Sequence, residues 1–368
     1  MGLMKSFWTN KKVFITGHTG FKGGWLSLWL TTLGAEVVGY SLQPPTQPNF
    51  CNVVELEKSL NSIIADIRNY DNLYKTMQHF KPVIVFHLAA QPLVRKSYIS
   101  PLETYETNIM GTANLFEAVR NTDSVRVIVN VTSDKCYKNK ELTYGYKEND
   151  PMGGYDPYSS SKGCAELVTS AFRNSFFNPK DYDKTHKIAL ASARAGNVMG
   201  GGDWAKDRLI PDIIRSIQAK QNIIIRNPNA IRPWQHVLEP LSGYILLAEK
   251  LWTNGPKYSE GWNFGPNDES IVPVLTMVQN IIRLWGETNI WEIDKNPNPH
   301  EAQLLKLDIS KANNELNWTP VYQIQEALEK TTYWYKEFYS SNENMQSYSI
   351  NQISEYMQNT VQTEVKVK

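Results

Sequence analysis

Short apolar, β-branched runs alternate with helical patterns along the first half of the chain. The runs are KVFIT from Lys12, AEVVGY from Ala35, SIIAD from Ser62, PVIVFHLAA from Pro82, VRVIVNVTS from Val125 and KIALASAR from Lys187. Continuous apolar runs of this length, separated by helical patterns, are typical of strands buried on both faces of a parallel sheet. We therefore predict an α/β fold with a Rossmann-like, doubly wound parallel sheet.

The intervening segments predict helices from Trp25 to Leu33, from Tyr70 to Phe80, from about Tyr98 to Arg120 and from about Pro157 to Phe177. After residue 194 the alternation loosens, EPLSGYILLAEKLW predicts a helix that returns to the sheet, and GWNFGP predicts another short strand. We expect a nucleotide-binding domain over residues 1–194 with a return segment at about 236–265. Residues 195–235 and 266–340 are expected to form a smaller, mixed α/β substrate-binding lobe. Residues 341–368 are read as a polar tail that is weakly ordered at its end.

Composition excludes several classes of function. The 368 residues include 38 Lys and Arg against 37 Asp and Glu, so no global field attracts nucleic acid or a membrane surface. Three cysteines without CxxC spacing, and six scattered histidines, predict neither a disulfide framework nor a metal site. No window approaches a membrane span and the N-terminus lacks a long apolar core, so we expect a cytoplasmic protein.

The segment VFITGHTGFKGGW places a glycine-rich turn directly after the first strand. Glycines permit positive φ and let the backbone approach a pyrophosphate, whose charge faces the N-terminus of the following helix. A tight βα turn without a ligand is the alternative reading, because the motif is weak by itself. The loop residues expected to contact a dinucleotide are Gly17, His18, Gly20, Phe21, Lys22 and Gly23.

The end of the second run lacks the acid that usually binds the adenosine ribose in this fold. Ser41 stands where the acid belongs, and no Arg or Lys lies between Tyr40 and Glu57 to hold a 2′-phosphate. NADP is therefore disfavoured, and NAD must find its ribose contacts elsewhere, which predicts partial cofactor occupancy on purification. His18 either compensates for Ser41 or faces solvent. Asp66 is placed to meet the adenine edge.

Two further motifs carry chemistry. YDPYSSSK sets Tyr158 and Lys162 four residues apart, on one face of a helix, so that the ammonium can lower the phenol pKa. NVTSDKCY supplies Ser133, Asp134 and Lys135 at the end of a strand, where doubly wound sheets place their active sites. A Tyr activated in this way acts as a base toward an alcohol.

Together with HLAAQPLVRKSY, RAGNVMGGGDW and PHEAQLLKLDISKA, these motifs make the chain resemble the extended short-chain dehydrogenase/reductases from about Lys11 to Trp334. The most similar family is that of the CDP-glucose 4,6-dehydratases, for which GHTGFKGGW is the specific signature. The resemblance implies tightly held and recycled NAD, CDP-glucose as substrate, loss of water in deoxysugar biosynthesis, and a homodimer or dimer of dimers. It also implies cofactor contacts from Ile67, Leu88, Ala89 and Ala90.

The resemblance also implies the roles of the catalytic residues. Tyr158 removes the C4 hydroxyl proton with help from Lys162 and Ser133, and Asp134 protonates the departing C6 hydroxyl. Lys135 stands where dTDP-glucose dehydratases carry a Glu that takes the C5 proton. Lys135 takes the C5 proton if its amine is neutral. The alternative is that Lys135 only stabilises the enolate.

Local cations are needed to hold a diphosphate in a protein of nearly neutral charge. Arg95, Arg208 and Arg232 are the candidates, Arg226 ranks lower, and a surface salt bridge is the alternative for each. Asn197 resembles a substrate-contacting Asn, Gln91 is expected to reach the sugar, and Trp204 either stacks on the cytosine or belongs to the core. His300 is a weaker substrate candidate. His87 and His236 are interpreted as structural, as is Asn108, which is expected to bend its helix.

Three competing functions remain open. A sugar-nucleotide 4-epimerase needs the same Tyr, Lys and NAD but no acid and base for elimination, and the Asp134–Lys135 pair separates the two. A dehydratase of another nucleotide sugar differs only in base specificity, which rests on resemblance. A non-catalytic dinucleotide sensor would tolerate loss of Tyr158 or Lys162, and both are present.

Overall fold

A seven-stranded, wholly parallel sheet forms the centre of the computed structural model, which describes residues 5–288, 291–294, 305–341 and 343–366. Its strand order is β11-β6-β5-β4-β1-β2-β3. The strands are β1 (Lys12–Thr16), β2 (Glu36–Ser41), β3 (Asn61–Ile64), β4 (Ile84–His87), β5 (Val127–Val131), β6 (Ala189–Ala195) and β11 (Gly261–Phe264). The six early apolar runs and GWNFGP are therefore strands, as expected, and the doubly wound α/β fold is confirmed.

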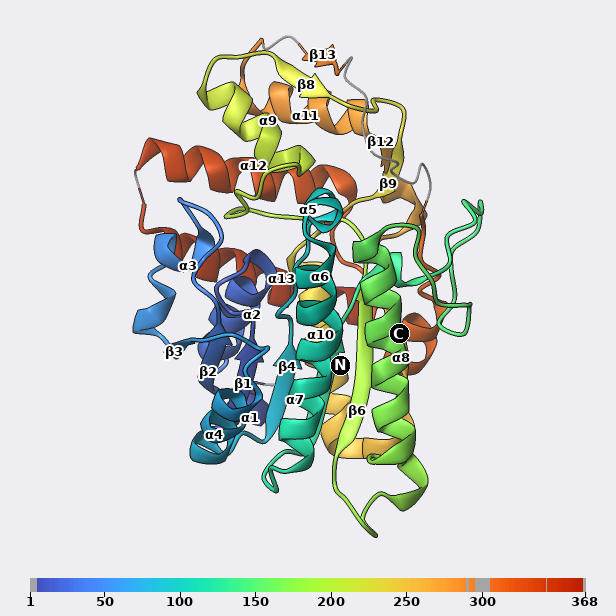
Figure 1. The fold of residues 1–368 in the computed structure, drawn as a ribbon. Coiled ribbons are helices and arrows are strands. Elements are labelled where there is room, and N and C mark those ends of the chain that lie inside the picture. The colour runs from blue at the N-terminus through green and yellow to red at the C-terminus, as the bar shows by residue number, and fades with distance from the viewer. Residues whose placement is uncertain (1–4, 289–290, 295–304, 342, 367–368) are drawn as a thin grey trace.

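The sheet is covered on both faces, as its apolar sequence requires. In β5, Val127 and Val129 face one core together with α2 and α10, whereas Ile128 faces a second core with α4, α7 and α8. The covering helices are α2 (Phe21–Thr32), α4 (Tyr70–Phe80), α7 (Gly111–Arg120), α8 (Pro157–Ser175) and α10 (Leu238–Asn254). Figure 1 shows α7 and α8 running alongside β4 and β6.

The segment expected as one helix from Tyr98 to Arg120 is divided. It comprises α5 (Val94–Ile99), α6 (Pro101–Tyr105), the π-helix η2 (Glu106–Met110) and α7. Pro101 lies at the first turn of α6, where its missing N–H costs nothing, so the break falls at Ser100. Asn108 lies in the π-helix, a form whose extra residue per turn deforms an α-helix.

Short strand pairs and further helices gather at the top of Figure 1, beyond α5. They comprise β8 (Ile223–Ile225) with β13 (Trp291–Ile293), β9 (Ile231–Pro233) with β12 (Ile271–Pro273), α9 (Leu209–Gln218), α11 (Val274–Trp285) and α12 (Ile324–Ser340). A further pair, β7 (Val198–Met199) with β10 (Gln235–His236), comes between β6 and β11 in sequence. The remaining short elements are α1 (Lys5–Trp8), α3 (Phe50–Val53), the 3₁₀ turns η1 (Leu56–Lys58), η3 (Asp134–Cys136), η4 (Pro179–Asp181), η5 (Gly255–Tyr258) and η6 (Asp268–Ser270), and the π-helix η7 (Ala312–Leu316). Among the described residues no helix is both long and apolar enough to cross a membrane.

The segment expected as a polar tail contains a helix, α13 (Met345–Lys366), which is a correction to the sequence analysis. The Tyr356 hydroxyl donates to the Glu239 carboxylate at 2.7 Å, and Trp334 Nε1 donates to Ser349 Oγ at 2.9 Å. Ile353 is fully buried between these contacts. A sparse apolar stripe therefore anchors a helix whose mean composition looks disordered.

Candidate active site

The glycine loop after β1 is a tight turn pressed against the end of β4. Gly17 has φ +80°, and its N–H donates to Tyr40 O at 2.9 Å. A Cβ at Gly17 would lie 2.7 Å from Ala89 N, and one at Gly23 would overlap Gly17 O. Only glycine fits at both positions, so the first helix turn packs directly on the loop backbone.

The N-terminus of α2 is open to an anion. Gly20 is the N-cap and offers no side-chain hydrogen bond to the first turn, which contains no acidic residue. The free N–H groups of such a turn attract negative charge. Phe21 is half-buried against Gly200, whose added Cβ would lie 3.2 Å from the Phe21 ring, so its side chain belongs to the packing.

Lys22 extends from this first turn toward the catalytic motifs. It is half-buried, and burial lowers its pKa to about 8, with the Arg208 and Lys162 charges acting in the same direction and Asp134 opposing them. A cation at the positive end of a helix is unfavourable by itself. Lys22 therefore lies near both the glycine loop and Asp134, and it adds a second lysine to the site that contains Lys162.

His18 is buried, which excludes the solvent-facing alternative. Its Nε2 lies 2.7 Å from Ser62 Oγ, and its ring occupies the space above Gly39, where an added Cβ would overlap it. Burial lowers the His18 pKa to about 4, so the ring is neutral. Ser41 Oγ instead pairs with Thr19 Oγ1 at 2.8 Å. His18 packs beneath the loop and does not face solvent.

The remaining residues expected at the cofactor lie along the carboxyl ends of β3 and β4. Asp66 pairs with Arg68 at 2.6 Å, and the Arg68 hydrogen bonds lower the Asp66 pKa. Ile67 is buried against Gly111, which leaves only its backbone for a ligand. Thr16 Oγ1 accepts from the N–H groups of Leu88 and Ala89 at 3.2 Å each, and Ala90 follows, half-buried.

His87 is structural, as expected. Its Nδ1 lies 2.6 Å from Thr16 Oγ1 and its Nε2 lies 3.1 Å from Thr112 Oγ1. Burial and the Lys162 charge lower its pKa to about 3, so it is neutral. His236 is likewise fully buried, beside the rings of Trp25 and Tyr322.

The motif after β5 forms a compact turn at the end of the strand. Ser133 Oγ donates to Asp134 Oδ1 at 2.9 Å and accepts from Lys135 N at 3.2 Å. Ser133 and Asp134 are buried, and burial raises the Asp134 pKa against the opposing effects of Lys135, Ser133 and Lys22. Lys135 is half-buried, with its Nζ 5.9 Å from the centre of the Tyr158 ring.

Tyr158 and Lys162 lie on the first turns of α8, facing this motif. Tyr158 is 8% exposed and Lys162 is 6% exposed. Burial raises the Tyr158 pKa to about 12, whereas a hydrogen bond with Ser133 and the Arg208 charge lower it. Burial lowers the Lys162 pKa to about 8. The Arg208 charge thus favours the phenolate.

Three lysines near Tyr158 lack a paired carboxylate among the described residues, which indicates that this site binds a ligand. In the part of the chain that the structure describes, no ion pair or hydrogen bond engages the ammonium groups of Lys22, Lys135 and Lys162, whereas Lys306 and Lys330 pair with carboxylates. Partly or wholly buried cations without a paired carboxylate are costly unless a ligand compensates them. The arrangement can therefore hold anionic groups beside a tyrosine hydroxyl and a carboxyl group.

Two residues expected at the substrate are engaged elsewhere. Gln91 Nε2 donates to Thr104 Oγ1 at 3.0 Å and Gln91 Oε1 accepts from Leu93 N at 2.7 Å, so this buried side chain shapes its own loop. Trp204 packs edge-on against aromatic rings of α12, with the Phe338 ring 5.1 Å away. It is a core residue, which decides between the two alternatives weighed for it.

Of the four arginines expected to bind the diphosphate, Arg208 acts on Tyr158, and the others make the contacts given below. Arg208 pairs with Asp203 at 2.7 Å and acts on Tyr158, so it lies at the site. Arg95 pairs with Asp207 at 3.4 Å, and Arg226 donates to Asp207 O at 3.0 Å. Arg232, in β9, donates to Ile231 O at 3.0 Å.

Asn197 lies half-buried in the turn between β6 and β7, where its backbone carbonyl accepts from Gln235 N at 3.2 Å. His300 lies outside the described residues.

A buried network behind the site was not expected from the sequence. Glu166, one turn after Lys162, accepts from Thr132 at 2.5 Å and from Ser192 at 2.7 Å, and pairs with Arg194 at 2.8 Å. Arg194 also donates to Tyr137 at 2.6 Å. The network ties α8 to β5, β6 and the turn after η3. The sequence feature that could have indicated this network is Glu166 itself, four residues after Lys162 and so on the same face of the helix.

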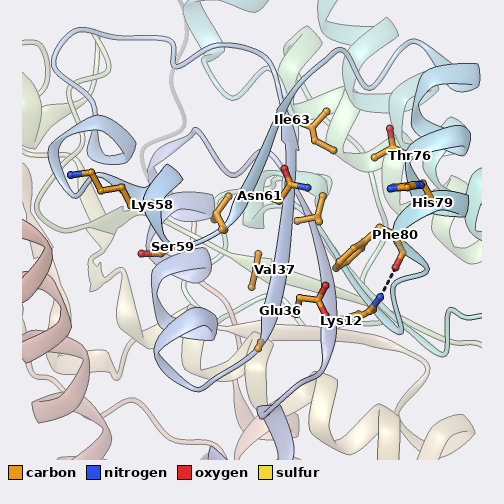
Figure 2. A pocket seen from close by; sticks show the side chains of 13 residues that line it. Lys12, Glu36, Val37, Lys58, Ser59, Asn61, Ile63, Thr76, His79 and Phe80 are labelled. Atoms are coloured by element: carbon orange, nitrogen blue, oxygen red, sulfur yellow. Dashed lines mark hydrogen bonds between the residues drawn. The ribbon is translucent and has the colours of Figure 1, made fainter.

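Cavities occur away from Tyr158. One cavity, of about 580 Å³, lies near the amino ends of β1 and β2, where Lys12 donates to Phe80 O at 3.3 Å. Figure 2 shows the side chains that line it. Another, of about 760 Å³, is lined by Arg95, Asp207, Arg215 and Arg226 among others. Among the described residues no cluster of His, Cys, Asp or Glu side chains could hold a metal ion.

Known proteins resemble this chain at two levels. A family model described as GDP-mannose 4,6 dehydratase matches residues 14–331. The CDP-glucose 4,6-dehydratase of Salmonella typhimurium is 57% identical over 97% of this chain and 99% of its own length.

Solved structures share the fold at low identity. The dTDP-glucose 4,6-dehydratase of Bacillus anthracis in complex with NAD gives a TM-score of 0.73 at 21% identity, covering 91% of this chain and 98% of that one. The UDP-glucose 4-epimerase of Thermotoga maritima with UDP-glucose gives 0.75 at 18% identity, covering 89% and 99%. The fold is thus common to dehydratases and epimerases and does not separate them.

Proposed function

The chain belongs to the family described as GDP-mannose 4,6 dehydratase, and from this membership and the site geometry we propose that it is an NAD-dependent CDP-glucose 4,6-dehydratase. The reaction converts CDP-glucose to CDP-4-keto-6-deoxyglucose. The observation that carries the proposal is the turn of Ser133, Asp134 and Lys135 facing Tyr158, in a chain 57% identical to a relative of that name.

The residues of the glycine loop fit NAD. The positive φ of Gly17, the glycines that leave no room for a Cβ and the uncapped first turn of α2 suit a pyrophosphate. Asp66 and the backbone from Leu88 to Ala90 would hold the remainder, with Lys162 at the nicotinamide ribose. When bound, NAD would take up the C4 hydrogen with its electron pair and return it to C6.

Tyr158 removes the proton of the C4 hydroxyl in the oxidation step. Ser133, hydrogen-bonded to Tyr158, and the Arg208 charge favour the phenolate against the effect of burial. The buried position keeps bulk water away from the reacting hydroxyl. The new ketone then acidifies the C5 proton.

Asp134 and Lys135 carry out the elimination. Burial keeps Asp134 available as an acid, because it favours the neutral carboxyl, and the proton goes to the departing C6 hydroxyl. Lys135, beside Tyr158, takes the C5 proton when its amine is neutral and later returns a proton to C5. Arg208 and Arg232 would bind the substrate diphosphate from the smaller lobe, residues 195–235 and 266–340.

Purified protein incubated with CDP-glucose tests the function directly. The expected product is lighter by one water, with no net formation of NADH, as mass spectrometry and absorbance would show. A CDP-galactose product would instead identify a 4-epimerase. Faster turnover of a dTDP-, UDP- or GDP-sugar in the same assay would reassign the base specificity.

We also propose that the protein is a cytoplasmic homodimer, or a dimer of dimers, formed through α6, α7 and α8. Leu102 is 75% exposed, Met110 is 56% exposed and Leu167 is 60% exposed, on neighbouring helices. Apolar surface of this kind is typical of an interface. The variant Leu167→Glu is expected to shift the protein toward monomer in sedimentation, and an unchanged mass would contradict the proposal.

A further inference from the structure

Gly196 lies directly against the carboxyl group that serves as the acid in the proposed function, on which this inference rests. A Cβ at Gly196 would lie 2.9 Å from Asp134 Oδ2 and 3.4 Å from Asp134 Cγ. Carbon and oxygen atoms that are not bonded repel each other at 2.9 Å, so an added methyl group would displace the carboxyl. The missing side chain of Gly196 therefore leaves room for the acid.

The backbone at Gly196 does not itself require glycine. Positive φ occurs at five of the described glycines, such as Gly17 and Gly202, and Gly196 is not one of them. An alanine at this position would therefore escape the strain of the left-handed region. What distinguishes glycine from alanine here is the room beside Asp134.

The carboxyl of Asp134 is also held from a second direction. Ser133 Oγ donates to Asp134 Oδ1 at 2.9 Å, and the Lys135 backbone N–H donates to Ser133 Oγ at 3.2 Å. Asp134 is 4% exposed, so close packing leaves its carboxyl few other orientations. A methyl group at position 196 would therefore turn the carboxyl away from Ser133.

The strand ends bring Gly196 to this place. At the carboxyl ends of β5 and β6, Thr132 N donates to Ala193 O at 2.9 Å, so the residues that follow the two strands share one edge of the sheet. Pro233 of β9 also borders Gly196, with its Cγ 3.5 Å from the position of the added Cβ. The acid thus lies where the smaller lobe meets the sheet.

Other glycines of the same segment make different contacts. A Cβ at Gly201 would overlap the Trp334 ring, and one at Gly202 would overlap the Phe50 ring. Those two glycines allow aromatic packing in the core, whereas Gly196 adjoins a side chain of the proposed chemistry.

We propose that Gly196 is a positioning residue for the elimination step, because its missing side chain keeps the Asp134 carboxyl in the orientation from which it protonates the departing C6 hydroxyl. Gly196 has no side chain that could react, and it acts only through Asp134. Oxidation at C4 depends on Tyr158 and does not use this carboxyl. A side chain at position 196 therefore slows elimination and spares oxidation.

Gly196→Ala is expected to lower turnover of CDP-glucose by about 10- to 10²-fold, the upper value being the cost of misplacing a reacting group by about 1 Å. Reduced cofactor should accumulate in a single turnover, as absorbance would show, because oxidation continues while the C6 hydroxyl departs slowly. The KM for CDP-glucose should change less than about twofold, because the contact serves the transition state of elimination and not substrate binding.

Gly265→Ala is the matched control. Gly265 follows Phe264 of β11, which pairs with Ala195 of β6, so it holds the position equivalent to Gly196 on the neighbouring strand. A Cβ at Gly265 would meet the Ile309 side chain at 3.4 Å, which is an ordinary contact. Turnover and cofactor absorbance of this variant should match those of the wild type.

A double-variant cycle tests whether Gly196 acts through Asp134. Asp134→Ala removes the carboxyl, so adding Gly196→Ala should change the remaining turnover less than about twofold. If Gly196→Ala alone does not fold, as judged by circular dichroism, the double variant should fold, because the overlap is gone. Folding of the double variant alone would locate the overlap at Asp134.

The results separate this role of Gly196 from the proposed function. A wild-type protein that does not dehydrate CDP-glucose overturns both. For a wild-type dehydratase, the positioning role alone is overturned if Gly196→Ala keeps full turnover, or if it slows oxidation as much as elimination so that no reduced cofactor accumulates. Full additivity of the Gly196 and Asp134 changes, or a double variant that also fails to fold, would overturn it as well.

Discussion

At the scale of single residues, Lys135 and His18 are the residues that distinguish the two motifs of this chain from their general forms. Both stand in motifs whose general role is readable, a strand-end turn and a glycine loop. Lys135 lies beside Tyr158 as the proposed chemistry requires, whereas His18 is buried and takes no part in a solvent-facing contact. An unusual residue within a readable motif is thus a candidate for the chemistry in the case of Lys135, and a packing residue in the case of His18.

Lys135→Met is expected to lower elimination by about 10²- to 10⁴-fold while oxidation at C4 persists, because the C5 base is missing. Reduced cofactor should then accumulate during a single turnover, which absorbance would detect. Lys135→Glu should move the acid limb of the pH–rate profile to lower pH, since a carboxyl ordinarily ionises at much lower pH than an amine. Full elimination activity with an unchanged profile would contradict the base role, and exposed Lys138→Glu is the control.

Gly39→Ala is expected to lower the free energy of unfolding by about 1–3 kcal/mol, the range for an overpacked core, because its Cβ would overlap the His18 ring. Adding His18→Ala should recover at least half of that loss. Urea denaturation of the wild type, both single variants and the double variant measures the coupling. Additive losses would show that the ring and Gly39 do not share one space.

At the scale of elements, α8 carries both the reacting side chains and their anchor. Tyr158 and Lys162 face the site, and Glu166 lies one turn further along, within the buried network with Arg194. Although burial opposes ionisation, the Arg194 charge and hydrogen bonds lower the Glu166 pKa. The helix and the strand ends are thus held by one ion pair behind the site.

Glu166→Gln is expected to cost about 3–5 kcal/mol of unfolding free energy, because it leaves Arg194 buried without its counter-charge. Denaturation by urea measures the loss. Glu355→Gln, which breaks the more exposed pair with Lys330, should cost only a small fraction of this. Equal losses in the two variants would mean that burial does not set the strength of these pairs.

At the scale of the whole molecule, long-range contacts decide how the C-terminal segment is used. Glu239, at the start of α10, accepts from Tyr322 N at 2.6 Å and from the Tyr356 hydroxyl of α13. His236 lies fully buried in the same region, and burial lowers its pKa to about 3. The region joins the sheet, α12 and α13 in one core.

His236 should make stability depend on pH. Its pKa is below the ordinary 6.5 in the folded state, so the unfolded chain binds more protons and acid favours unfolding. The stabilising contribution is complete above pH 6.5 and is lost as pH falls toward 3. At pH 5 the wild type should have lost about 2 kcal/mol that His236→Gln does not lose. Urea denaturation at pH 7 and pH 5 tests this, with exposed His79→Gln as control.

Much of the architecture and of the catalytic set follows from the sequence, for a local reason. Strand runs, the glycine turn and the i, i+4 placement of Tyr158 and Lys162 depend on neighbouring residues, and each of these elements is present. The roles of the catalytic side chains remain proposals. The motif that contains Lys135 and the name of the 57% identical relative both support the proposed dehydration.

Tertiary structure alone decided the remainder, because it depends on which distant surfaces meet. The local pattern left Trp204 and His18 open, and burial against α12 and Gly39 placed them in the core. The Arg208 charge that lowers the Tyr158 pKa comes from fifty residues further along, and a helix forms in the polar C-terminal segment because three side chains find partners. Local sequence determines elements and motifs, whereas burial and charge at the site arise only when the chain has folded.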